Sequence, residues 1–189
     1  MIMFTSENFE IIAVTSRDLC PRPLWEQILH IREAGITRVI LREKDLSADD
    51  YTILAEKVLR ACENCSVTLT LHSFPQAARK LGISSLHMPL QWLNERIRNE
   101  FEMVGTSVHS MEQLQTAEQL GVDYVIAGHI FATNCKKGLP PRGTGFLSDI
   151  CNQTKLPVYA IGGITSDRIP ELRQTGAAGA CIMSGAMQL

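Results

Sequence analysis

The sequence YVIAGHIF at residues 124–131 places a histidine, His129, directly after an apolar run and a glycine. Imidazole titrates near neutral pH, so a histidine at such a position can carry a proton to and from a substrate. The same position also suits a hydrogen-bonded packing residue, and the residues alone leave both interpretations open. Other histidines are weaker candidates: His30 is expected within a helix, and His87 can fill the interior of a sheet or barrel.

A charged motif, LREKD at residues 41–45, interrupts another apolar run. In an extended strand alternate side chains point to the same side, so Arg42 and Lys44 are expected to face one direction. Two cations placed in this way can hold a carboxylate or a phosphate. An exposed turn with local ion pairs is the alternative interpretation.

The elements that position these residues recur with a regular rhythm. Short apolar runs appear roughly every 20 residues, each followed by a turn and a stretch with helical spacing. Helices are expected to begin after Ser47, Ser110 and Thr165, whose hydroxyls can accept hydrogen bonds from first-turn amides. Helix ends are expected at Gly82 and Gly121. The expected strands are residues 9–16, 38–43, 67–71, 85–89, 103–108, 124–131, 157–163 and 179–185.

Alternating strands and helices predict a parallel sheet, and eight strands predict a closed (β/α)8 TIM barrel. A doubly wound open sheet is the alternative, but its glycine-rich fingerprint is missing after the first strand, which ends VTSRD. A chain of 189 residues is expected to form a single domain over residues 1–189. Few residues follow the eighth strand, so the last helix is expected to be short or absent. The apolar surface left there predicts a homo-oligomer.

In such a barrel the carboxyl ends of the strands form the active site. His72 follows the third expected strand, and Ser107 near the end of the fifth is a candidate lining residue. Small residues follow the last two strands, where backbone amides can approach a phosphate closely. Tight turns that need glycine are the alternative explanation. These small residues are Gly162, Gly163, Ser184 and Gly185.

Composition narrows the classes of partner. Lys and Arg total 18 against 20 Asp and Glu, and no basic run stands out, which argues against nucleic acid and acidic membranes. The amino terminus has neither a basic region nor an unbroken apolar stretch, so we expect no signal peptide, no membrane span and a cytoplasmic protein. Cys62 and Cys65 form a CxxC pair, but no second pair or histidines at ligand spacing accompany it. We interpret the pair as coincidental free thiols.

From Ile11 to Ala186 the chain resembles the thiamine phosphate synthase superfamily. The matching motifs, in order, are LREKD, SLHMP, GTSVHS, DYVIAGHIFATNCKKG, PVYAIGGIT and GAAGACIMSGA. The resemblance implies a barrel, a role in thiamin biosynthesis and a thiazole phosphate ligand.

Departures from the synthase pattern bear on the reaction. In that pattern strand three ends in Asn-Asp and strand four is followed by Gly-Gln-x-Asp, whose aspartates hold the magnesium that binds pyrophosphate. Here these positions read His72 with Ser73, and Pro89 with Trp92. Magnesium prefers oxygen ligands and neutralises a leaving pyrophosphate, so losing both carboxylates is expected to cripple the synthase reaction.

The motif GHIFATNCKKG resembles the TenI branch of the superfamily, the thiazole tautomerases, in which the histidine carries the proton. This resemblance implies a reaction without metal or cofactor that isomerises carboxythiazole phosphate to its aromatic tautomer, with His129 as general acid and base. A divergent synthase and a non-catalytic binding or regulatory protein stay open as alternatives. The residues implied to bind the substrate are Arg42, Lys44, His72, Thr133 and Lys136, with Gly162, Gly163, Ser184 and Gly185 at its phosphate.

Overall fold

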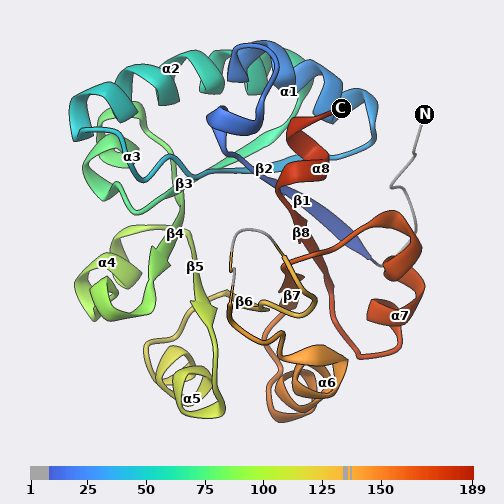
Figure 1. Cartoon of the computed structure of the whole chain (residues 1–189). Helices are drawn as coiled ribbons and strands as arrows, with labels where there is room; N and C mark the ends of the chain where they lie inside the picture. The colour runs from blue at the N-terminus through green and yellow to red at the C-terminus, as the bar shows by residue number, and fades with distance from the viewer. Residues whose placement is uncertain (1–8, 134–135, 137) are drawn as a thin grey trace.

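The computed structural model describes residues 9–133, 136 and 138–189. Within these residues eight parallel strands pair in chain order and β8 closes on β1, with the helices arranged around the outside (Figure 1). The prediction of a (β/α)8 TIM barrel is therefore confirmed. The strands are β1 Glu10–Val14, β2 Arg38–Leu41, β3 Thr68–His72, β4 Ser85–Pro89, β5 Met103–Val108, β6 Tyr124–Gly128, β7 Val158–Ile161 and β8 Gly179–Ile182. The helices are α1 Leu24–Glu33, α2 Ala48–Cys65, α3 Pro75–Leu81, α4 Glu95–Glu100, α5 Met111–Gln119, α6 Gly143–Gln153, α7 Ile169–Arg173 and α8 Ser184–Met187.

Side chains of the strands alternate between two hydrophobic layers. In β2, Val39 and Leu41 pack in the large cluster that also contains the buried faces of the helices. Ile40 belongs to a second cluster with Tyr124 and Tyr159, which fills the barrel interior. This alternation decides which residues beyond a strand end face the mouth of the barrel.

Two of the three expected helix starts carry the expected cap. The hydroxyl of Ser47 accepts a hydrogen bond from the Asp50 amide at 3.1 Å, and that of Ser110 accepts one from the Gln113 amide at 3.3 Å. Thr165 differs, because its side chain caps no backbone amide and a 3₁₀ turn at Ser166–Arg168 precedes α7. The helix after β7 therefore begins later than the sequence pattern predicts.

The last helix, α8, is a single short turn. Its Met187 is fully buried, and the Ala186 carbonyl accepts a hydrogen bond from the Gln27 side chain at 2.9 Å. The prediction of a short or absent last helix is confirmed in its first form, and α8 lies beside β1 and near α1 (Figure 1).

The CxxC pair lies in the last turn of α2, a helix of 18 residues. Cys62 and Cys65 are free thiols, and burial raises the pKa of Cys62 to about 12. A thiol held in its protonated form is a poor nucleophile and metal ligand, which supports the interpretation of Cys62 as a packing residue. Neither α2 nor any other helix in the described part of the chain is long and apolar enough to cross a membrane.

Candidate active site

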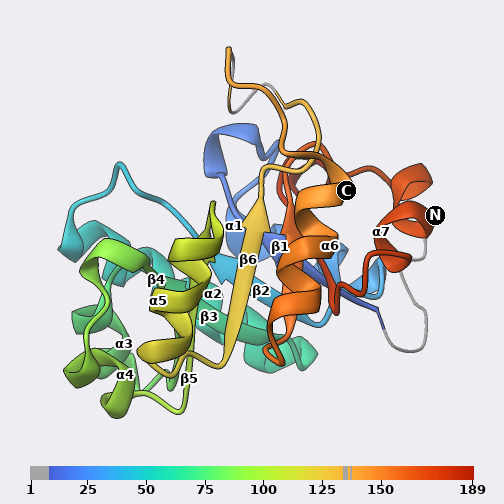
Figure 2. The same ribbon diagram turned by 90° about the horizontal axis from the view of Figure 1, so that it is seen from below.

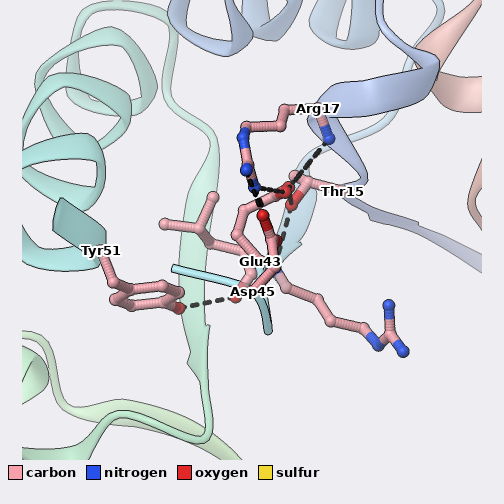
Figure 3. Close-up of polar contacts among 7 residues, drawn as sticks. Thr15, Arg17, Glu43, Asp45 and Tyr51 are labelled. Carbon is pink, nitrogen blue, oxygen red and sulfur yellow. Dashed lines mark hydrogen bonds and ion pairs between the residues drawn. The ribbon is translucent and has the colours of Figure 1, made fainter. Parts of the chain in front are cut away.

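The LREKD motif begins with the last residue of β2, and its acidic and basic side chains have different surroundings. Glu43 is 3% exposed and accepts hydrogen bonds from the Thr15 hydroxyl at 2.6 Å and from the Arg17 amide at 3.1 Å. The Arg17 guanidinium also contacts Glu43 at 3.1 Å and donates to Asp45 at 2.7 Å, as Figure 3 shows. The carboxylates of the motif therefore pair with Arg17, which is distant in the sequence, and not locally within an exposed turn.

The cations of the same motif lie elsewhere. Arg42 is half-buried and Lys44 is exposed, and neither forms an ion pair with any described carboxylate. The pKa of Lys44 lies below its usual value because the surrounding protein partly desolvates the ammonium group and because Arg42 and Lys136 add positive charge nearby. Three cations from the loops after β2 and β6 thus gather at the carboxyl end of the barrel, which favours an anionic ligand.

Two stacked histidines, one from β3 and one from β4, lie in the barrel near these cations. The rings of His72 and His87 have centroids 5.4 Å apart and planes inclined by 21°. Burial is the main cause that lowers the pKa of both rings, to about 3 for His87, and the charges of Lys44 and Arg42 act in the same direction. His72 therefore stays neutral and can offer a ligand a hydrogen bond but no charge. His87 is 2% exposed, so the expectation that it fills the interior is confirmed.

His129 follows β6 and lines a cavity of about 430 Å³, a volume typical of small-ligand sites. Lys136, His109 and Arg142 line the same cavity, together with the apolar residues 139–141. The Nε2 atom of His129 lies 3.4 Å from the Leu139 carbonyl oxygen, a contact too long to hold the ring firmly. His129 and Lys136 thus line one ligand-sized space.

The connection between β6 and α6 forms the wall of this cavity. Its described residues extend beyond the end of β6 (Figure 2), and the Arg142 amide donates to the His129 carbonyl at 3.0 Å. The Gly143 amide similarly donates to the Ile130 carbonyl at 3.0 Å. The chain on both sides of the cavity is therefore anchored at the strand end.

Gly162 and Gly163 follow β7 and pack against the chain around His129. A Cβ atom at Gly162 would lie 2.4 Å from the His129 Cβ, and one at Gly163 would lie 2.3 Å from the Ala132 carbonyl oxygen. Both glycines have positive φ, and the Phe131 amide donates to the Gly162 carbonyl at 3.0 Å. The pair is small because another segment of backbone lies against it, a reason that neither sequence-based interpretation included.

Ser184 and Gly185 are exposed at the start of α8, where first-turn amides have no partner within the helix. Thr133 is half-buried, and its carbonyl accepts a hydrogen bond from the Lys136 amide at 3.2 Å. Asn134, Cys135 and Lys137 of the same motif lie outside the described residues.

The predicted site residues therefore do not all line the same cavity. His129 and Lys136 share the cavity, and Lys136 links it through charge to Lys44. The other predicted residues are absent from the described lining of that cavity. They are Arg42, Lys44, His72, Thr133, Gly162, Gly163, Ser184 and Gly185.

Sequence analysis gave neither His109 nor Arg142 a role in the site. The Nδ1 of His109 donates to the Gly128 carbonyl at 2.7 Å, directly before His129. A signal for His109 exists, because it stands just beyond the polar end of β5 in the motif GTSVHS. The long connection that carries Arg142 also points to function, since loops of this length in compact domains are often functional.

The residues at the strand ends do not fit a magnesium ion. At the two positions where the synthase pattern has aspartates, Ser73 offers a hydroxyl 2.6 Å from His72 Nδ1, and Trp92 offers an indole. The nearby Glu43 is occupied by Thr15 and Arg17. Across the described residues no group of three or more His, Cys, Asp or Glu side chains is arranged to hold a metal ion. Magnesium needs carboxylate oxygens that this donor set does not supply.

Comparisons with known proteins point to one family. A family model described as thiamine monophosphate synthase matches residues 11–186. The thiamine-phosphate synthase of Fusobacterium nucleatum is 29% identical over 185 residues, which cover 95% of this chain and 89% of that protein. The thiamine-phosphate synthase 2 of Streptococcus pneumoniae is 30% identical over 160 residues, which cover 82% of this chain and 76% of that protein.

A solved structure agrees with the fold. The thiamine phosphate pyrophosphorylase of Pyrococcus furiosus superposes with a TM-score of 0.83 at 24% identity, covering 95% of this chain and 88% of that one. At this identity the likeness supports the barrel architecture alone.

Proposed function

This chain belongs to the thiamine monophosphate synthase family, and from that membership we propose that it is a thiazole tautomerase of thiamin biosynthesis. The proposed substrate is a carboxylated, non-aromatic thiazole phosphate, and the product is its aromatic tautomer. The observation that carries the proposal is the pairing of His129 with Lys136 in one ligand-sized cavity. The absence of fitting magnesium ligands from the described strand ends supports it.

The reaction moves one proton and needs no oxidant. His129 takes the proton from the ring carbon that bears the carboxylate, and the electron pair released there moves through the conjugated system. The imidazolium then returns a proton to the exocyclic carbon, which leaves an aromatic ring. A positioned acid and base of this kind contributes about 10²–10⁴ in rate. The loose contact of His129 with Leu139 supports this role, because the ring can turn between two carbon atoms.

The cations bind the two anionic groups of the substrate. Lys136 lies beside His129, and Arg42 with Lys44 extends the positive region toward β2. Positive charge near the substrate carboxylate also stabilises the electron density that forms when the neighbouring carbon loses its proton. His72 and Thr133 belong to the same proposal as hydrogen-bonding residues.

The phosphate is proposed to bind the loops after β7 and β8. Ser184 and Gly185 are exposed small residues directly after β8, which supports this assignment because backbone amides beside small residues can approach a phosphate closely. Gly162 and Gly163 stay in the assignment, although their contacts with the chain around His129 already explain their small size.

A second candidate is a divergent synthase, which the names of the relatives favour. That activity joins a pyrimidine pyrophosphate to a thiazole phosphate and implies a magnesium ion that the residues present do not fit. A binding or regulatory protein is the third possibility, since a ligand cleft can outlast catalysis.

The test is an assay with the non-aromatic carboxythiazole phosphate that follows the ultraviolet absorbance of the aromatic product, with and without a chelator. We expect turnover that a chelator does not reduce. We expect the turnover rate of His129→Ala to be about 10²–10⁴-fold lower than that of the wild type. His30→Ala is the matched control, because His30 is an exposed histidine of α1 and is expected to leave turnover unchanged.

The alternatives give different results. Turnover only with the pyrimidine pyrophosphate and magnesium would establish a synthase. Binding of the thiazole phosphate without any turnover, unchanged in His129→Ala, would establish a binding protein. Full activity of His129→Ala with the thiazole substrate would remove His129 from the mechanism.

A further inference from the structure

A series of polar side chains crosses the barrel interior and ends at Ser107, near the carboxyl end of β5 and so at the end of the barrel where strand ends form active sites. Arg38 begins β2 and lies 4.5 Å above the ring centroid of Tyr124. The Tyr124 hydroxyl lies 3.2 Å from Nδ1 of His87, and Nε2 of His87 lies 2.9 Å from the Ser107 hydroxyl. Arg38, Tyr124 and His87 are buried, whereas Ser107 is half-buried near the end of β5.

The position of Tyr124 is built into the fold. A Cβ atom at Gly105 would lie 2.0 Å from the Tyr124 ring, so a glycine in β5 provides the space that the ring occupies. The other interior tyrosine, Tyr159, directs its hydroxyl differently and donates to Glu10 at 2.6 Å. Only one of these two tyrosines therefore acts on His87.

The first hydrogen bond of the series has one direction. Burial raises the pKa of Tyr124, so its hydroxyl keeps a proton. Arg38 carries only donors and a positive charge, which orients that proton away from the guanidinium. Within the described residues, His87 Nδ1 is the only nitrogen or oxygen acceptor in hydrogen-bond contact with this hydroxyl. Tyr124 therefore donates and Nδ1 accepts.

The second hydrogen bond follows from the first. His87 stays neutral, because burial and then Arg38 lower its pKa to about 3. A neutral imidazole carries one N–H, so a ring that accepts at Nδ1 must donate at Nε2. Nε2 thus donates to the oxygen of Ser107, and the Ser107 proton is left to point to another acceptor.

We propose that Arg38 and Tyr124 are positioning residues that act through His87 and make Ser107 a hydrogen-bond donor to an acceptor atom of the ligand. The acceptor is a carboxylate oxygen or an unprotonated ring nitrogen, and a ligand that presents an N–H or O–H group at this point is disfavoured because it leaves the Ser107 proton without that acceptor. The identity of that ligand as a thiazole phosphate rests on the proposed function. The direction of the hydrogen bonds rests on the interior residues alone.

The first measurement is nitrogen NMR of the ligand-free protein with labelled histidine, because protonated and unprotonated ring nitrogens resonate far apart. The His87 signals are assigned by their loss in His87→Gln. We expect Nε2 protonated and Nδ1 unprotonated in the wild type. In Tyr124→Phe we expect a mixture of tautomers, since the ring over Arg38 stays while the donor is gone. Tyr159→Phe is the matched control and is expected to leave the tautomer unchanged.

The second measurement is a double-mutant cycle on binding of the aromatic carboxythiazole phosphate. We expect Ser107→Ala to weaken binding about 10- to 150-fold, the usual effect of losing a hydrogen bond to a charged group. Tyr124→Phe is expected to weaken binding by less, and to add nothing in the Ser107→Ala background. Thermal unfolding of each variant separates these effects from loss of the fold.

Two results would overturn the proposal. One is a protonated Nδ1 of His87 in the wild type. The other is a double mutant whose loss of ligand binding equals the product of the fold-losses of Tyr124→Phe and Ser107→Ala. The NMR result needs neither ligand nor turnover, so it stands even if the protein is not a tautomerase. Conversely, a wild type that has the expected tautomer but no turnover rejects the proposed reaction and leaves the donor assignment in place.

Discussion

Replacement of Gly162 by alanine tests whether close packing at the end of β7 positions His129. The new Cβ atom would lie 2.4 Å from the His129 Cβ and 2.9 Å from its Cα. The backbone at Gly162 has φ of 102°, a region that residues with a side chain rarely adopt. Backbone strain of this kind costs about 1–3 kcal/mol, and overpacking costs about 1–3 kcal/mol more.

The two effects together predict a loss of about 2–6 kcal/mol in the free energy of unfolding. For a domain of this size that corresponds to a decrease in Tm of about 4–24 °C. If the Gly162→Ala variant folds, displacement of His129 by about 1 Å is expected to reduce its turnover rate about 10²-fold. The measurements are denaturant unfolding and the aromatisation assay.

Gly121→Ala is the matched control. Gly121 also has positive φ, at 69°, but a Cβ atom added there would meet nothing within 4 Å, and the residue is remote from His129. We expect it to lose only the strain component of about 1–3 kcal/mol and to keep full turnover. Equal stability and equal turnover of the two variants would refute the packing argument. Normal stability with weakened phosphate binding in Gly162→Ala would favour the phosphate role instead.

Three further predictions concern stability and assembly. Folding keeps His72 and His87 neutral, with pKa values well below the 6.5 expected in the unfolded chain, so the unfolded state binds more protons as the pH falls below 6.5. Stability is therefore lost from pH 6.5 downward, by about 2 kcal/mol per histidine at pH 5, and His87→Gln is expected to remove about half of this loss in denaturant unfolding. Arg17→Met removes the guanidinium from the buried carboxylate of Glu43 but keeps the hydrogen bonds from the Thr15 hydroxyl and the backbone amide of residue 17, and is expected to cost about 1–3 kcal/mol by the same measurement. The chain is predicted to form a homo-oligomer, which light scattering at several protein concentrations tests, and a monomer at all of them would contradict the prediction.

The sequence alone was sufficient for the architecture. Eight apolar runs separated by helical spacing predict a barrel because parallel strands must be buried on both faces, and that pattern is written in local residue types. Ser47 and Ser110 cap their helices as expected, since a cap depends on residues within one turn. Thr165 does not, because the chain turns through a short 3₁₀ segment before α7 begins.

The sequence also selected His129 and Lys136, because strand ends carry function in a barrel and both lie in one motif. It could not assign the charges of LREKD, since Glu43 is held by Thr15 and Arg17 of the segment that follows β1. Contacts between different βα units depend on how the barrel closes, which no local pattern encodes.

What only the tertiary structure decided is therefore the set of contacts between strands. The approach of Gly162 to His129 joins β7 to β6, and the hydrogen bonds from Tyr124 through His87 to Ser107 join β6, β4 and β5. The sequence determined which side chains stand at each strand end and which face the interior. Closure of the barrel determined which of them meet, because residues distant in the chain come into contact only when every strand has its neighbours.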